Sequence, residues 1–111
     1  MKVPIVYFWK HARRVTVDGN TLSPAKSQKL RNHSPDGFNW GYAGSGPSQL
    51  ALALLMEFSG QRKFWCLQNY QQFKVDVIAQ LPQGDAQLPI SVIKKWVADH
   101  MVKEGPGLKP I

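Results

Sequence analysis

Hydrophobic and polar positions divide the chain into a strand-forming first third and a helical remainder. Val3 to Trp9 is a run of β-branched and aromatic residues, and Arg14 to Val17 places two valines on one face and polar side chains on the other. Both patterns predict strands. Residues 18–20 (Asp-Gly-Asn) tolerate positive φ and predict a hairpin turn. Thr21-Leu22 follows as a short returning strand.

Helical patterns occupy the second half. The segment from Pro47 to about Phe58 is apolar almost all round, which is typical of a helix buried at the centre of a domain. Residues 62–81 repeat apolar side chains every three or four positions, with glutamines on the opposite face, which predicts a second helix. Residues 89–101 predict a third helix, with Ile90, Ile93, Trp96 and Val97 as its buried stripe. A short helical turn is expected at residues 25–30.

These elements predict the fold class and the domain organisation. We expect a small α+β domain, in which an antiparallel sheet from the N-terminal half packs on three helices, the first of them buried. The domain covers residues 1–101. Residues 102–111, with their glycines and prolines, are expected to form a flexible C-terminal tail.

An aromatic and glycine-rich segment leads into the buried helix. Residues 34–37 fit a type I turn, and Phe38, Trp40 and Tyr42 then alternate with smaller residues, so an extended backbone would place the three rings on one face. Gly41, Gly44 and Gly46 lie just before or at the start of the buried helix. Glycines occupy similar positions in phosphate-binding loops, where free backbone N–H groups at a helix start face the phosphate. The dinucleotide pattern lacks its third glycine, where Gln49 stands, and the Walker pattern lacks its lysine. The alternative is that these glycines only allow close backbone contact.

The charge is uneven along the chain. Residues 1–33 hold seven basic groups and one acid, which gives +6, whereas the other 78 residues hold seven basic and six acidic groups, which gives +1. A basic third attracts phosphates, nucleic acid or an acidic protein, or it is only a solvated surface. Cys66 is the sole cysteine, and the apolar run Leu50 to Met56 is far shorter than the roughly 20 residues of a membrane helix. We expect a cytoplasmic protein without a membrane partner.

Catalytic and metal-binding patterns are weak. The three histidines are scattered and Cys66 has no ligand at a zinc spacing. Ser45 and His33 flank the same aromatic segment, but Ala43 and Pro47 stand where a nucleophile elbow requires glycines. No pair of carboxylates lies beside the glycines. An enzyme is therefore less favoured than a binding protein, and we assign no catalytic residue, metal or cofactor.

The central motif resembles the signature of a family of small domains of unknown function from bacteria, archaea, plasmids and phages. The resemblance rests on RNHSPDGFNWGY at residues 31–42 and GSGPSQLALALL at residues 44–55, and it extends over about residues 7–98. Pro89 stands where the family tends to place a threonine before its last helix. The family has no established activity to carry over. Its occurrence in mobile elements implies a role in host–parasite conflict.

Two functions follow as hypotheses, and the oligomeric state stays open. The first is a non-catalytic domain that binds an anionic ligand, such as a nucleotide or a cyclic nucleotide signal, at the glycine-rich start of the central helix. The second is an anti-defence, anti-CRISPR-like inhibitor from a mobile element or phage, which binds an acidic protein or a nucleic-acid-bearing complex through its basic N-terminal third. The expected ligand-binding residues are Arg31, Asn32, His33, Ser34, Trp40, Tyr42, Gly44, Ser45, Gly46 and Ser48. The expected partner-binding residues are Lys10, Arg13, Arg14, Lys26 and Lys29.

Overall fold

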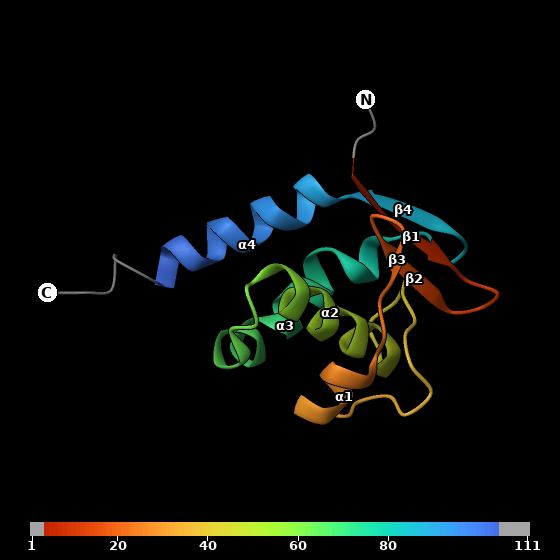
Figure 1. Cartoon of the computed structure of the whole chain (residues 1–111), viewed down its shortest axis with the longest axis horizontal. Coiled ribbons are helices and arrows are strands. Elements are labelled where there is room, and N and C mark those ends of the chain that lie inside the picture. Colours follow the sequence, from red (N-terminus) through yellow and green to blue (C-terminus); the bar gives the residue numbers. More distant parts are fainter. Residues whose placement is uncertain (1–3, 105–111) are drawn as a thin grey trace, which may run out of the picture.

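The fold is α+β, with one four-stranded antiparallel sheet and four α-helices in the described part of the chain. The computed structural model describes residues 4–104. The sheet order is β3-β2-β1-β4, with β1 at Ile5–Trp9, β2 at Arg14–Val17, β3 at Asn20–Thr21 and β4 at Ala86–Pro89. Figure 1 shows the sheet at one end of the molecule, with α1, α2 and α3 below it and α4 leading away.

Strand register assigns each side chain to one of two sheet faces. Phe8 pairs with Val15 and with Ala86, and Val6 pairs with Val17 and with Leu88, so these residues form the inner face. Val6, Phe8 and Val15 are almost completely buried in the core. The alternate residues of β1, β2 and β4 form the outer face, as the period-2 alternation of a strand requires.

The helices are α1 (Ala25–Leu30), α2 (Ser45–Phe58), α3 (Lys63–Asp76) and α4 (Ile90–Glu104), with a 3₁₀ helix, η1 (Ile78–Gln80), after α3. Every residue of α2 from Gly46 to Met56 is buried, which confirms the expected central helix. Contacts of Ser59 with Cys66 and of Ser48 with Gln71 show that α2 and α3 run antiparallel.

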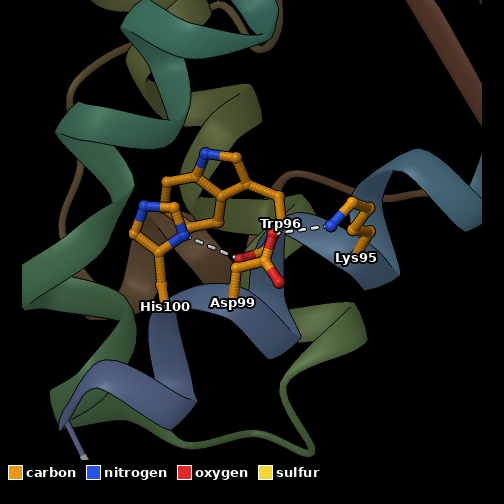
Figure 2. A network of polar contacts seen from close by, with 4 residues as sticks. All are labelled: Lys95, Trp96, Asp99 and His100. Atoms are coloured by element: carbon orange, nitrogen blue, oxygen red, sulfur yellow. Dashed lines mark hydrogen bonds and ion pairs between the residues drawn. The ribbon is translucent and has the colours of Figure 1, made fainter.

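Helix α4 is attached to the core through Trp96. The Trp96 indole N–H donates to Asp76 at 2.9 Å, and its ring packs edge-on against Phe73. On the other side the His100 ring stacks on Trp96, with ring centroids 3.6 Å apart, and the Trp96 carbonyl lies 2.8 Å from His100 Nδ1. Figure 2 shows this stack beside the exposed ion pair of Lys95 and Asp99. No helix of the described residues is both long enough and apolar enough to span a bilayer.

Several boundaries differ from the sequence-based predictions: β3 lies at Asn20–Thr21 instead of Thr21-Leu22, and α2 begins at Ser45 instead of Pro47. Helix α3 ends at Asp76, and the chain turns at Val77 (φ −124°, ψ −57°) into η1 instead of continuing to residue 81. Residues 86–89 form strand β4, which the sequence pattern did not predict, so Pro89 ends a strand and α4 begins at Ile90. Helix α4 continues to Glu104, and the rest of the expected tail, 105–111, lies outside the described residues.

Candidate functional site

The start of α2 carries two backbone N–H groups, of Ser45 and Gly46, without an acceptor among the described residues. Gly44 precedes the helix with extended backbone and provides no side-chain cap, and Pro47 has no N–H. The first helical hydrogen bond comes from Ser48 N–H, which donates to the Gly44 carbonyl at 2.9 Å. Free N–H groups and the positive end of the helix dipole favour an anion at this position.

Each glycine before or within this turn has a close neighbour. A Cβ on Gly41 would lie 2.8 Å from Gln83 Cα, and one on Gly46 would lie 2.6 Å from Asn39 Cβ. A Cβ on Gly44 would lie 2.5 Å from the Tyr42 ring. Close contact therefore accounts for the three glycines, as the alternative interpretation of the sequence allowed, and the free N–H groups are a separate feature.

The aromatic residues of the segment do not share one face, so that expectation is wrong. Phe38 and Trp40 are buried in the core, and the Trp40 indole N–H donates to the Gly84 carbonyl at 2.8 Å. Tyr42 is 42% exposed. The reason is Gly41, whose φ of +84° breaks the extended alternation between Trp40 and Tyr42. Of these rings, Tyr42 is the one that a ligand at the start of α2 can contact.

A buried glutamine fixes the loop that carries the expected ligand-binding residues. Gln49 Oε1 accepts hydrogen bonds from the N–H groups of His33 (2.7 Å) and Ser34 (3.0 Å). Its Nε2 donates to Ser27 Oγ (2.9 Å) and to the Arg31 carbonyl (3.1 Å). A polar side chain in an otherwise apolar helix is stable only when it is fully bonded. Gln49 therefore holds residues 31–34 against the first turns of α2.

His33 lies among positive charges. Its Nε2 forms a hydrogen bond with the hydroxyl of Tyr70 on α3, and the two ring centroids lie 5.4 Å apart. Burial, and then the charges of Arg31 and Lys74, lower the pKa of His33 below its ordinary value. Neutral His33 can therefore coexist with the two cations at neutral pH, and an anion beside it would favour the charged imidazolium.

Lys74 belongs to the surroundings of the same helix start. Ser48 Oγ on α2 donates to Gln71 Oε1 on α3 at 3.4 Å, so these two residues lie opposite each other in the antiparallel pair of helices. One turn earlier on α2 is Ser45, and one turn later on α3 is Lys74, so these residues lie at the same level. The sequence pattern gives no signal for Lys74, because only the antiparallel contact of the two helices brings it to the level of Ser45.

Lys10 reaches the start of α2 from the sheet. Its Nζ donates to Asn39 Oδ1 and to the Trp40 carbonyl (3.1 Å), and it lies 4.5 Å from the Trp40 ring centroid. Burial first, and then Arg13, lower the pKa of Lys10. Since Asn39 packs against Gly46, a second cation approaches the same turn of α2.

The other expected residues occupy different surroundings. Asn32 and Ser45 are exposed, whereas Ser34 is half-buried and Ser48 is buried. Lys10, Arg13 and Arg14 belong to the β1–β2 hairpin, whereas Lys26 and Lys29 lie on α1. The expected partner-binding set therefore forms two separate basic regions.

The α1 region borders a hollow of about 310 Å³. Its lining consists of Lys26, Lys29, Leu30, Met56, Gln61 and Lys63, with three lysines and no acid among them. Lys63 joins the region from the start of α3, and the sequence pattern gave no signal for this. The described residues contain no group of three or more His, Cys, Asp or Glu side chains placed to hold a metal ion.

Comparison with known proteins identifies a family and no activity. The family model described as "Family of unknown function (DUF6166)" matches residues 9–99. No curated protein and no solved structure matches the chain significantly.

Proposed function

The chain belongs to the family of unknown function DUF6166, and we propose that it is a non-catalytic binding domain for an anionic ligand at the start of α2. The ligand class is a nucleotide or a cyclic nucleotide signal. The observation that carries the proposal is the presence of two N–H groups without acceptors at Ser45 and Gly46 among the described residues. Gly46 packs against Asn39, which binds Lys10, and Lys74 and Arg31 act on the nearby His33.

The phosphate and the base have separate contacts in this proposal. The N–H groups of Ser45 and Gly46 donate to phosphate oxygens, as helix N-termini do in many phosphate sites. Lys74 and the Arg31–His33 loop supply the charge that balances the phosphate. Tyr42, which packs over Gly44, supplies an exposed ring for the base. Trp40 has no stacking role here because its ring is buried.

Titration of His33 by NMR tests the phosphate contact. With a nucleotide or cyclic dinucleotide at millimolar concentration, the pKa of His33 should rise, because a bound anion favours the imidazolium. The amide signals of Ser45 and Gly46 should shift in the same titration. Unchanged His33 and amide signals across the whole nucleotide panel would refute the site.

Variants separate the charge contribution from the stacking contribution. Lys74→Gln should weaken binding by about tenfold, since it removes a charge-assisted contact, whereas Lys94→Gln on the exposed side of α4 should leave it unchanged. Wild type should bind a nucleoside triphosphate more tightly than inorganic triphosphate, and Tyr42→Ala should abolish that difference. Equal losses from Lys74→Gln and Lys94→Gln would mean that net charge alone attracts the ligand.

An inhibitor that binds an acidic partner is the second candidate. Its support is the hollow with three lysines and an apolar floor of Leu30 and Met56, which complements an acidic surface with an apolar side chain. In this candidate function the partner is a host defence complex. Reversing Lys26 and Lys29 to Glu should abolish capture of the partner by the tagged protein, and Lys94→Glu should not. Equal capture by wild type and the double variant would exclude this surface.

A further inference from the structure

The outer face of the sheet carries an exposed aromatic pair on a central strand. Tyr7 and Trp9 of β1 are 41% and 38% exposed, and their rings stack with centroids 5.5 Å apart and planes 25° apart. Register places Thr16 of β2 and Gln87 of β4 on either side of Tyr7, and Arg14 beside Trp9. The face is therefore apolar along its middle strand and polar on both sides.

Arg14 extends over this face. Its guanidinium lies 5.4 Å from the Trp9 ring centroid, and its Nη2 donates to Thr21 Oγ1 at 3.4 Å. The side chain therefore crosses from Trp9 toward β3 and places a positive charge beside the rings. Arg14 is the cation that the structure places on this face, whereas the Lys10 amine of the same hairpin is bound to Asn39 and to the Trp40 carbonyl near the start of α2.

Two hollows flank the aromatic pair. One, of about 570 Å³, is lined by residues of β1 and β2 that include Tyr7, Trp9, Arg14 and Thr16. The other, of about 430 Å³, lies toward β4 and also includes Tyr7 and Trp9. The rings thus form a ridge between two shallow depressions, which leaves space for planar groups on both sides.

One polar atom on this face has no partner. Thr16 is 2% exposed, and its Oγ1 is a buried oxygen without a hydrogen bond within the described residues. Thr16 lines the larger hollow beside Tyr7 and Arg14. A buried hydroxyl without a partner is costly, so a ligand group that reached Thr16 would gain a hydrogen bond that the free protein lacks.

We propose that the outer face of the sheet binds single-stranded nucleic acid, with bases stacked on Tyr7 and Trp9. Arg14 neutralises a phosphate, and Thr16 Oγ1 donates to or accepts from a base or sugar. Exposed rings on a sheet combined with adjacent cations are what single-strand binding requires, because every base has a face that can stack. This surface is separate from the start of α2.

Charge favours nucleic acid over a protein partner at this face. Asp18 and Asp85 are the acidic residues of the two hollows, and Asp85 already accepts a hydrogen bond from the Lys10 N–H at 2.8 Å. The Arg14 guanidinium lies directly beside the Trp9 ring, which suits a phosphate next to a stacked base. A duplex does not expose base faces, so it should bind only through its charge.

Fluorescence of the intact protein with labelled uridine and thymidine decamers tests the proposal. The other three tryptophans are buried, so quenching by the oligonucleotide should report mainly Trp9. Trp9→Ala and Tyr7→Ala should each weaken binding by between about fivefold and about 150-fold, the range for losing a stacked base. Phe64→Ala, which removes a 74% exposed ring from α3, should change nothing.

Salt dependence tests the role of Arg14. Arg14→Gln should lower the salt slope of single-strand binding by about 0.7, whereas Arg62→Gln, at an exposed position before α3, should not. Thermal unfolding of each variant would establish that it is folded. Equal affinity of wild type and Trp9→Ala, or equal competition by a duplex, would overturn the proposal. Absence of binding at low salt would also overturn it.

Discussion

Replacing Gln49 with leucine removes four hydrogen bonds from the protein while keeping a side chain of similar size. Gln49 is completely buried, so no water is available at the position of the lost amide. The N–H groups of His33 and Ser34 lose their acceptor, and Ser27 Oγ and the Arg31 carbonyl lose their donor. The loop at residues 31–34 would then be held only by its remaining contacts.

The expected loss of stability follows from the hydrogen bonds. An intramolecular hydrogen bond contributes about 0.5–1.5 kcal/mol net, so four correspond to about 2–6 kcal/mol. His33 and Ser34 are half-buried and can regain water when the loop moves, which favours the lower part of that range. We therefore expect Gln49→Leu to cost about 2–4 kcal/mol, or about 8 to 30 °C in the unfolding midpoint of a domain of this size.

Urea unfolding followed by circular dichroism measures the loss, and amide exchange locates it. Exchange should accelerate first at His33 and Ser34. Gln68→Leu, at an exposed position of α3, is the matched control and should change stability by less than about 0.5 kcal/mol. A cost below about 1 kcal/mol for Gln49→Leu, or unchanged exchange at His33, would refute the role of Gln49 as the anchor of the loop.

Three further predictions concern a glycine, the cysteine and a histidine. Gly46→Ala should cost about 1–3 kcal/mol in urea unfolding, because its Cβ would meet Asn39, whereas Gly84→Ala, with open space around it, should be nearly neutral. Burial raises the pKa of the Cys66 thiol, so a disulfide reagent should react at least about 100-fold more slowly with native than with urea-unfolded protein. The pKa of His33 is lower in the folded than in the unfolded protein, so stability should fall as the pH drops below about 6.5 and level off below the folded pKa. His33→Gln should flatten that dependence, and an unchanged pH profile would contradict it.

Local sequence patterns predicted the fold class, and they predicted those helices and strands whose conformation depends only on their own residues. Strand β2 lies at Arg14–Val17 as expected, because alternating valines and the Asp18-Gly19 turn act within a few residues. Strand β4 could not be predicted, since Ala86–Pro89 contains one large apolar residue, Leu88, and is extended only because β1 pairs with it. The apolar side chains keep a spacing of three to four residues from α3 through η1. The break at Val77 does not interrupt this spacing, so the sequence pattern could not reveal it.

The sequence predicted which segments of the chain form the candidate site, but not the contacts that hold them together. The loop at residues 31–34 and the start of α2 do lie together, held by Gln49. Gln49 itself is the signal in the sequence, because a glutamine directly before a run of leucines and alanines in a buried helix requires hydrogen-bond partners. Lys74 and Tyr70 lie near the site because α2 and α3 pack antiparallel, and the spacing of residues along the chain does not predict that packing.

The two edge strands of the sheet, β3 and β4, affect whether the protein can aggregate at high concentration. Strand β3 has only two residues, and β4 ends at Pro89, which lacks the N–H needed to bond a neighbour. Neither margin offers a long row of free main-chain groups that a second molecule could extend. Concentrated samples should therefore resist fibril formation by strand addition, even though β1, which consists of β-branched and aromatic residues, would be prone to it at an edge of the sheet.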